Sequence, residues 1–317
     1  MTLTTVYHID APARLHPVAT GQPQPVNVPV RAIATAWCVT PYRVTRVGGD
    51  RNVHWVVHSR QGQYVLRCYR TDRDRAAIAY EFAVLAHLHR AGWPVAPPIG
   101  PLSTWNGRLF AMFPRLPGRP GRRPEQPARQ RWRGALLAEL HDALAPLSPG
   151  QRSGWRRLDT FIAQDAETLS GNARRRLADQ EWLREPILRH TLATREALGD
   201  CPADLPMTVV HGDFVPWNML WHRTTLTGLI DFDDARYDLR ATDVALARRR
   251  DRDAVVGGYR DRRGLSDVEV ALLAPLWRAY TLLYVADLVR APVWTPSIQQ
   301  ALEWCVRELE TTVPFRG

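Results

Sequence analysis

The sequence predicts an α+β protein with a small antiparallel sheet near its N-terminus and a larger, mostly helical remainder. Short runs rich in β-branched and aromatic residues follow one another between residues 42 and 69, with turn sequences between them. Apolar residues then recur at helical spacing in the longer segments 74–91, 128–144 and 266–290. At 317 residues, the chain is long enough for one large domain or for two lobes.

The predicted sheet begins as a meander of strands at residues 42–47, 53–58 and 63–69. Its first turn contains Gly48 and Gly49. A glycine pair is common in a plain hairpin turn, and it also lets the backbone approach another group closely.

A helix at residues 74–91 and a further strand at 108–113 continue this region. The Pro- and Gly-rich segment 114–120 then marks a boundary between two parts of the chain. Residues 1–30 contain five prolines and no clear periodicity, and we expect them to form an extended arm. Residues 150–205 are rich in charge and prone to form helices, but no pattern shows where those helices begin.

A capping-box signature opens the last apolar helix. Ser266 stands three residues before Glu269, the spacing at which the two side chains satisfy each other's backbone N–H groups. We expect this helix to be interrupted at Pro275 and to continue towards Arg290, because proline removes a helical hydrogen bond.

Composition excludes several classes of protein. A hydrophobic fraction of 45% and a charged fraction of 23% are ordinary for a globular chain. The first residues lack the pattern of a signal peptide, and no apolar run approaches the length of a membrane span, so we expect neither export nor a membrane partner. The four cysteines are far apart and form no C-x-x-C pair, which argues against a zinc site or a disulfide framework. We therefore expect a cytoplasmic protein.

All 42 basic residues are arginine, since the sequence contains no lysine. A Walker A loop and Schiff-base chemistry are excluded, because both need lysine. The net charge is +10, and the arginines are spread along the chain, with local clusters at 119–133, 174–176 and 248–252. We interpret this charge as solvated surface rather than as a nucleic-acid site, because no zinc-finger spacing or RNA-binding aromatic motif accompanies it.

The chemistry of the chain is concentrated in two apolar runs that end in polar residues. The first delivers Asp213 and, five residues later, Asn218; the second delivers Asp231. A tight loop can bring these three side chains to one point, where oxygen ligands hold a divalent cation beside a carboxylate that orients a hydroxyl. The alternative is a pair of buried hairpin strands whose polar ends only cap turns.

The pattern H-G-D-x-x-x-x-N at 211–218, followed by I-D-F-D at 230–233, resembles the aminoglycoside phosphotransferase and choline-kinase-like superfamily. Within it, the stretch from His211 to Asn218 looks most like the homoserine-kinase-like branch. The resemblance implies a bilobal, protein-kinase-like fold, with an N-lobe at 31–113, a hinge at 114–120 and a C-lobe at 121–317. It also implies ATP and Mg²⁺ as cofactors, Asp213 as the catalytic base, and Asn218 and Asp231 as metal ligands.

For the nucleotide, the resemblance implies that Arg67 stands where the family usually has a phosphate-binding lysine and that Glu81 pairs with it. Arginine carries the charge but is bulkier than lysine and is not its equivalent. The remaining residues expected at the nucleotide are Gly48, Gly49, Phe113 and Arg115.

Several other residues are assigned supporting roles. The resemblance places Asp243 at a helix start, where it would brace the catalytic loop. We expect His141 to be a packing or capping residue, and Asp233 and Asp234 to be solvated turn carboxylates.

The sequence thus predicts an ATP- and Mg²⁺-dependent phosphotransferase that acts on a hydroxyl of a small molecule, such as an antibiotic, an amino alcohol or a sugar. Two alternatives stay open. One is a pseudokinase that binds a nucleotide or a partner without transfer; the other is a basic nucleic-acid-binding protein. The acceptor, the choice between ATP and GTP, and the oligomeric state are left undecided.

Overall fold

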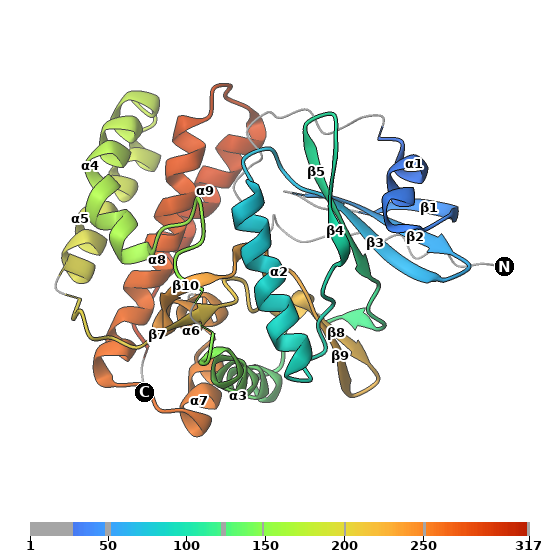
Figure 1. Cartoon of the computed structure of the whole chain (residues 1–317). Coiled ribbons are helices and arrows are strands. Elements are labelled where there is room, and N and C mark those ends of the chain that lie inside the picture. Colours follow the sequence, from blue (N-terminus) through green and yellow to red (C-terminus); the bar gives the residue numbers. More distant parts are fainter. Residues whose placement is uncertain are drawn as a thin grey trace. The chain divides into compact units, whose positions relative to one another are not determined.

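The computed structural model describes residues 28–47, 52–121, 125–147, 149–199, 201–249 and 252–315. The predicted α+β class is confirmed, with strands concentrated early in the chain and helices late (Figure 1). Contacts divide the chain into two compact units, which are described separately. The first comprises 1–72, 98–115 and 291–301; the second comprises 73–97, 116–290 and 302–317.

The first unit contains a five-stranded antiparallel sheet in the order β1-β2-β3-β5-β4. Its strands are β1 (Pro41–Val47), β2 (Val53–Ser59), β3 (Gly62–Cys68), β4 (Ile99–Trp105) and β5 (Arg108–Pro114). The predictions for β1, β2, β3 and β5 are confirmed to within a residue or so. β4 was not predicted, because Gly100 and Pro101 interrupt its apolar pattern, and its pairing with β5 is irregular between Ile99 and Ser103.

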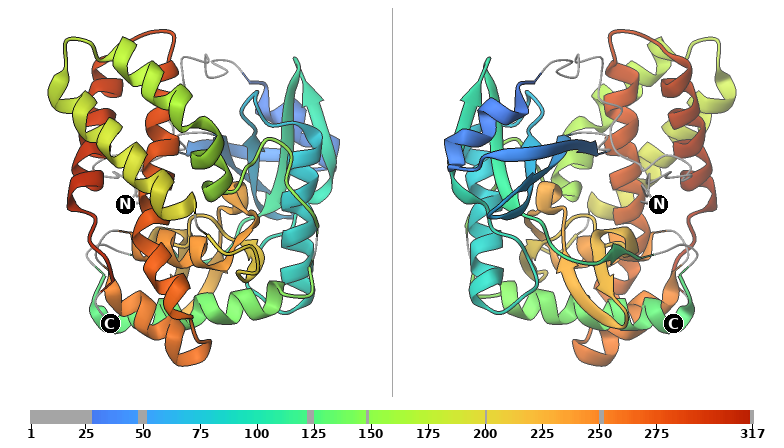
Figure 2. Two further views of the ribbon diagram at one scale, coloured as in Figure 1. Left: turned by 90° about the vertical axis from the view of Figure 1, so that its left-hand side faces the viewer. Right: turned by 90° about the vertical axis from the view of Figure 1, so that its right-hand side faces the viewer.

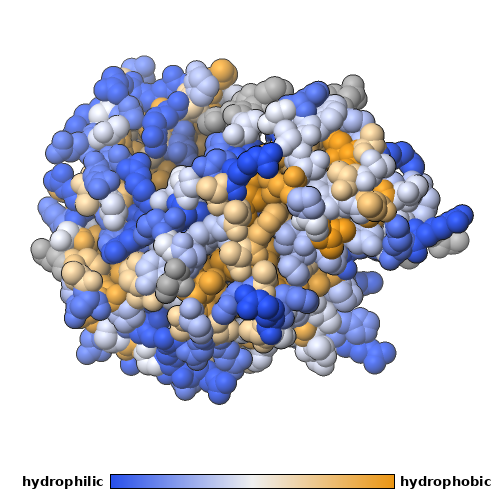
Figure 3. All heavy atoms as spheres, viewed as in Figure 1, coloured by the Kyte–Doolittle hydropathy of each residue, from blue (hydrophilic) through white to orange (hydrophobic). Residues whose placement is uncertain are grey.

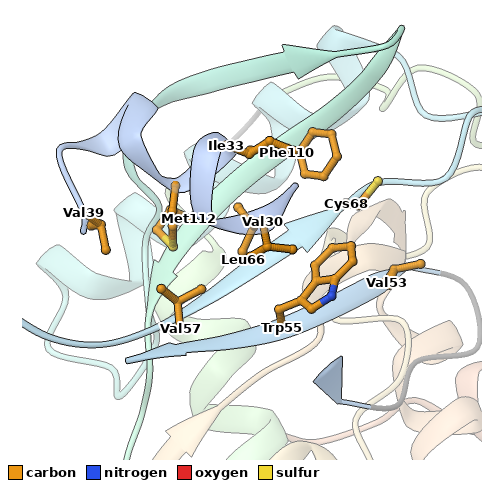
Figure 4. Packing of buried hydrophobic residues seen from close by; sticks show 11 residues of the cluster. Val30, Ile33, Val39, Val53, Trp55, Val57, Leu66, Cys68, Phe110 and Met112 are labelled. Atoms are coloured by element: carbon orange, nitrogen blue, oxygen red, sulfur yellow. The ribbon is translucent and has the colours of Figure 1, made fainter. Parts of the chain in front are cut away.

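One face of this sheet forms the core of the first unit. Alternate residues of the strands, such as Val53, Trp55 and Val57 on β2, point to the same side, as a period of two requires (Figure 4). The short helices α1 (Val30–Ala34) and η1 (Thr35–Trp37) stand beside this face, and Val30, Ile33 and Ala34 join the cluster. The apolar cluster fixes which side chains point away from it, including Arg67.

The second unit contains two small sheets. Strand β7 (Met207–Val210) pairs with β10 (Arg236–Leu239), and β8 (Met219–His222) lies between β6 (Arg119–Pro120) and β9 (Thr225–Leu229). Both of the predicted motif loops leave these strands, the first from β7 and the second from β9. The apolar runs therefore anchor the two loops in buried strands.

Helices make up most of the second unit. They are α2 (Arg75–Arg90), α3 (Pro127–Leu144), α4 (Leu158–Arg176), α5 (Glu181–Gly199), α6 (Arg240–Arg248), α7 (Asp253–Arg262), α8 (Asp267–Arg290) and most of α9 (Pro296–Thr311). Helices α4 and α5 pack on each other and on α8, and Figure 2 shows them side by side. Helices α3 and α7 approach so closely that a Cβ at Gly258 would lie 1.7 Å from the carbonyl oxygen of Arg131.

The capping box at the start of α8 is confirmed. The backbone N–H of Ser266 donates to Glu269 Oε2 at 2.9 Å, and the N–H of Glu269 donates to Ser266 Oγ at 3.2 Å. The expected interruption at Pro275 is wrong, because α8 is one helix of 24 residues with the proline inside it. The carbonyl that loses its partner belongs to Ala271, an exposed residue, so water can hydrate that group.

By length and composition, α8 could also cross a membrane, because an 18-residue window within it is mostly apolar. However, 67% of that window is buried inside the protein, as is usual for a core helix. Trp277 is among the largest fully buried side chains of the described residues and lies on this helix.

The interpretation of the arginine clusters as solvated charge is correct for one cluster and wrong for parts of the others. Arg174, Arg175 and Arg176 are exposed at the end of α4, where the surface over α4 and α5 is predominantly hydrophilic (Figure 3). Arg133 and Arg248 are fully buried, although they belong to the clusters at 119–133 and 248–252. Both side chains hydrogen-bond to backbone carbonyls, which offsets the cost of burying their charge.

The compact units do not follow the lobe boundaries that the resemblance implies. Helix α2 groups with the second unit, whereas it was expected in an N-lobe at 31–113. Residues 1–27 of the expected arm lie outside the described residues. The division into an arm, an N-lobe, a hinge and a C-lobe stays a prediction.

Candidate active site

The loop after β7 presents Asp213 through a backbone turn that only glycine permits. Gly212 has a φ of +82°, and a Cβ on it would lie 2.5 Å from the carbonyl oxygen of Asp234. The loop is therefore packed directly against the segment that follows Asp231. This close approach is one of the contacts that bring the two motifs together.

Asp213 and Asn218 are in direct contact. The Asn218 Nδ2 group donates to the Asp213 backbone oxygen and to Asp213 Oδ2, both at 2.9 Å. Because Nδ2 is occupied in this way, the amide is oriented and its Oδ1 is the atom that can ligate a cation. Asn218 ends the single 3₁₀ turn η2 (Pro216–Asn218), which closes the loop in the five residues noted in the sequence.

Asp231 follows β9 and is held next to the first motif. The backbone N–H of Ile230 donates to the Asn218 carbonyl oxygen at 2.9 Å. Asp231 itself has a left-handed backbone, with φ 71° and ψ 56°, and precedes the 3₁₀ turn η3 (Phe232–Asp234). A non-glycine residue in this conformation is uncommon, and aspartate adopts it more readily than most residues.

The donor chemistry of this site fits Mg²⁺. Among the described residues, no group of three or more His, Cys, Asp or Glu side chains could hold a metal ion by itself. Mg²⁺ usually needs less than that, since it keeps several waters and takes one or two carboxylates plus substrate phosphates. The Asp231 carboxylate and Asn218 Oδ1 are hard oxygen ligands of this kind.

Asp243 braces the catalytic loop, as expected. Its Oδ2 accepts the His211 N–H at 2.6 Å, and its Oδ1 accepts the Gly212 N–H at 3.0 Å. His141 contacts the same carboxylate through Nε2 at 3.1 Å and is fully buried, which confirms its packing role. Burial alone would raise the pKa of Asp243, but the hydrogen bond and charge of His141 outweigh it and hold the pKa below the usual value.

His211 supports the loop from within. Burial lowers the pKa of His211, although the nearby carboxylates of Asp243 and Asp213 act in the opposite direction. A neutral ring suits its contacts, because Nε2–H can donate to the Ile230 oxygen at 3.2 Å while Nδ1 accepts the Asp213 N–H at 3.3 Å. The ring thus links both motifs, and its centre lies 4.4 Å from that of the Phe232 ring, with the two planes tilted by 44°.

Arg152 fastens the segment that follows Asp231, a role that the sequence did not predict. Its Nη1 donates to the carbonyl oxygens of Phe232, Asp233 and Ala235 at 3.3, 2.9 and 2.8 Å. Its Nε donates to Ala77 on α2 at 2.9 Å, and its Nη2 lies 3.8 Å from Glu81 Oε2. Glu81 is therefore a buried partner of Arg152, and the segment between residues 150 and 205 supplies a residue of the site.

Asp233 and Asp234 are buried, so their interpretation as solvated turn carboxylates is wrong. Both are 3% exposed. Arg73 Nη2 lies 3.5 Å from Asp233 Oδ2 and 3.8 Å from Asp234 Oδ1, and its guanidinium stacks over Trp155. This charge pairing explains how two adjacent acids can be kept away from water.

A second buried arginine fastens the catalytic loop. Arg133 Nη1 donates to the carbonyl oxygens of Phe214 and Ala247 at 2.9 and 3.1 Å, and Arg133 pairs with Glu125 through Nε and Nη2. Arg133 and Arg152 thus hold the two motif loops by the same chemistry. Neither gives a signal in the sequence, because a buried arginine and a surface arginine look alike there.

The nucleotide residues expected in the first unit are placed as follows. On β3, Arg67 Nε contacts His54 Nε2 at 3.1 Å, and the guanidinium carbon lies 5.1 Å from the Phe113 ring centre. The backbone N–H of Arg115 donates to the Gln63 oxygen at 3.0 Å. Gly48 and Gly49 lie outside the described residues. Arg67 and Glu81 fall in different compact units, and their pairing stays a prediction.

Comparison with known proteins finds a family and relatives that match about three quarters of the chain. The model of the "Phosphotransferase enzyme family" matches residues 43–283. A homoserine kinase of Chelativorans sp. (strain BNC1) is 30% identical over 260 residues, covering 75% of this chain and 76% of the relative. A homoserine kinase of Xanthobacter autotrophicus is 30% identical over 270 residues, covering 78% of each.

Solved structures show the fold. Amicoumacin kinase hAmiN, solved with AMP-PNP and Ca²⁺, superposes with a TM-score of 0.66 at 16% identity and covers 91% of this chain and 95% of its own. A microcompartment-associated aminopropanol kinase gives a TM-score of 0.66 at 19% identity, with 85% and 90% covered. The resemblance and the kinase-like fold class predicted from the motifs are confirmed.

Proposed function

The chain belongs to the phosphotransferase enzyme family and is a small-molecule kinase with an alcohol acceptor, and we propose that it transfers the γ-phosphate of ATP with the help of Mg²⁺. The observation that carries the proposal is the joining of the two motif loops. Asn218 contacts Asp213 through its side chain and Ile230 through its backbone oxygen, so the carboxylate, the amide and the neighbour of Asp231 form one unit.

In the proposed mechanism, Asp213 accepts a hydrogen bond from the acceptor hydroxyl and orients it for attack. Asn218 and Asp231 would hold Mg²⁺, which would supply positive charge to the phosphate oxygens. Arg67, with its guanidinium over Phe113, holds the upstream phosphates, and Gly48, Gly49 and Arg115 complete the nucleotide contacts. Catalysis of this type depends on positioning and electrostatics, so few groups need to react.

The acceptor is a small hydroxylated metabolite handled in the cytoplasm. Relatives named homoserine kinase and a fold neighbour named aminopropanol kinase make short amino alcohols the first compounds to test. Antibiotics are the second group to test, because two other fold neighbours are named amicoumacin kinase and spectinomycin phosphotransferase.

The first test is calorimetric titration of ATP into the protein with and without Mg²⁺, repeated with Asp231→Ala. We expect Mg²⁺-dependent binding that the variant loses, while Asp267→Ala, a substitution of another acidic residue at the exposed start of α8, keeps it. No binding of ATP or GTP by the native protein would reject an active kinase and favour a pseudokinase.

The second test is Asp213→Asn in a coupled ADP-release assay. The variant should retain ATP binding and lose transfer by at least about a hundredfold, the range expected for a catalytic acid–base group. Turnover comparable with the native protein would reject Asp213 as the base.

A further inference from the structure

Arg249, the residue that follows α6, lies beside the catalytic carboxylate. Its Nη2 is 3.7 Å from Asp213 Oδ1, which is an ion-pair distance but too long for a hydrogen bond. We infer that Arg249 is a specificity-determining residue that binds an anionic group of the acceptor, so that the acceptor carries a carboxylate as well as the hydroxyl. The inference rests on the proposed function, because it takes Asp213 as the group that meets the acceptor.

The backbone of Arg249 is held in an unfavourable conformation. Its φ is 59° and its ψ is −133°, a combination that glycine adopts readily and a residue with a Cβ does not. Strain of this kind persists where the surrounding structure enforces it, and it is concentrated at active sites. At a helix end, where glycine is the usual choice, an arginine indicates that the side chain is needed.

The side chain of Arg249 is positioned by aromatic rings, and not all of its N–H groups are hydrogen-bonded within the described residues. Its guanidinium carbon lies 4.7 Å from the Trp217 ring centre and 5.8 Å from that of Trp277. Among the described residues, no hydrogen-bond partner is found for the buried Nε of Arg249 or for Nε1 of Trp277. The side chain is 15% exposed, so a small ligand can reach it.

The guanidinium of Arg249 is not hydrogen-bonded to its ion-pair partner Asp213, so its planar fork can still bind an anion. The charges of Glu308 and Tyr280 act on Arg249 with the same sign as that of Asp213, and the charge of Arg133 acts with the opposite sign. Burial lowers the pKa of the Arg249 guanidinium against the opposing effect of Asp213, because burial disfavours the charged form. A poorly hydrated guanidinium binds a carboxylate strongly through its planar fork.

The position of Arg249 favours the acceptor over the nucleotide as the source of that anion. The metal ligands assigned to the phosphates are Asn218 and Asp231, whereas Arg249 contacts Asp213, the group assigned to the acceptor hydroxyl. The partly exposed ring of Trp217 suits the short apolar chain that separates a hydroxyl from a carboxylate. A polycation would instead be repelled by Arg249.

The experiment compares acceptors that differ only by a carboxylate. The pairs are L-homoserine with 3-aminopropan-1-ol, L-serine with 2-aminoethanol, and L-threonine with 1-aminopropan-2-ol. We expect the native protein to prefer the carboxylate-bearing member of the best pair. Arg249→Gln should raise the KM for that member on the order of a hundredfold, with little change for its partner or in the KM for ATP. Arg260→Gln, an exposed arginine on α7, serves as the matched control.

Arg249→Gly separates loss of function from loss of folding. The substitution relieves the strained backbone, so the variant should unfold at the same urea concentration as the native protein or at a higher one, and still lose the preference for the carboxylate. Equal loss of kcat for both members of a pair, or a raised KM for ATP, would overturn the inference and assign Arg249 to the transferred phosphate.

Calorimetric titration of each carboxylate-bearing compound keeps the inference separate from the proposed function. Binding that depends on Arg249 in a protein without transfer activity would reject the kinase mechanism and support the anion site. If the native protein prefers the uncharged member, or binds none of the carboxylates, the anion site is rejected even where ATP-dependent transfer to another alcohol is found.

Discussion

Asp243→Asn removes one charge from a carboxylate that serves three donors at once. Both backbone N–H groups that begin the catalytic loop, those of His211 and Gly212, donate to it, and His141 contacts the same Oδ2. An asparagine of the same shape offers a single acceptor oxygen. Its amide nitrogen must then face one of the backbone N–H groups, donor against donor.

The cost follows from these contacts. One charge-assisted hydrogen bond is lost, about 1.5–3 kcal/mol, and one fully buried N–H is left against another donor, a further 1–3 kcal/mol or so. We expect the free energy of unfolding of the second unit to fall by about 3–5 kcal/mol, a large fraction of the stability of a typical domain. The catalytic loop loses its brace in the same step, so kcat should fall at least about tenfold.

The assay is urea unfolding followed by tryptophan fluorescence and by turnover, since two compact units need not unfold together. Asp204→Asn, a substitution at an exposed acid, is the matched control. A loss below about 1 kcal/mol at pH 7 would refute the reasoning, because it is less than a single charge-assisted hydrogen bond contributes.

The pH dependence provides a second check. The folded state holds the pKa of Asp243 below its usual value, so the stabilisation is present above about pH 4, the ordinary value for aspartate, and is lost as the pH falls through the folded-state pKa. The difference between the native protein and Asp243→Asn should therefore narrow in acid. A difference that stays constant down to pH 3 would show that the charge of Asp243 is not what matters.

Two further substitutions test the buried contacts. Arg152→Met removes the cation that Glu81 and three loop carbonyls share, and should cost about 3–5 kcal/mol in urea unfolding and weaken Mg²⁺-dependent ATP binding in calorimetry. Gly258→Ala places a Cβ 1.7 Å from the Arg131 oxygen, so α3 and α7 must separate, at about 1–3 kcal/mol in the same unfolding assay.

Each of these substitutions has a control in the same element or class. Gly264→Ala, at a position with open space, should leave stability nearly unchanged, and equal losses at both glycines would contradict the packing argument. For Arg152, the double variant with Glu81→Gln should recover part of the loss. Strictly additive losses would show that Arg152 and Glu81 are not coupled.

Much of the fold could be predicted because its signals are local. Alternating apolar residues gave β2 and β3, the helical stripe gave α2, and Ser266 with Glu269 gave the start of α8. Strand β4 was not predicted, because its residues include a glycine and a proline. The continuity of α8 through Pro275 was not predicted for another reason. Whether a proline breaks a helix depends on whether the carbonyl that loses its hydrogen bond can reach water, and this depends on the fold.

The sequence by itself determined which residues can do the chemistry, because Asp213, Asn218 and Asp231 are tied to their loops by short spacing after apolar runs. Only the tertiary structure decided what holds those loops in place. Arg133 donates to an oxygen 81 residues away along the chain, and Arg152 donates to one 83 residues away. Both arginines are buried by parts of the chain that lie far from them in the sequence. A guanidinium can donate hydrogen bonds to whichever carbonyl oxygens surround it, so the fold decides its partners. The residues next to an arginine in the sequence therefore do not indicate which carbonyls it will bind.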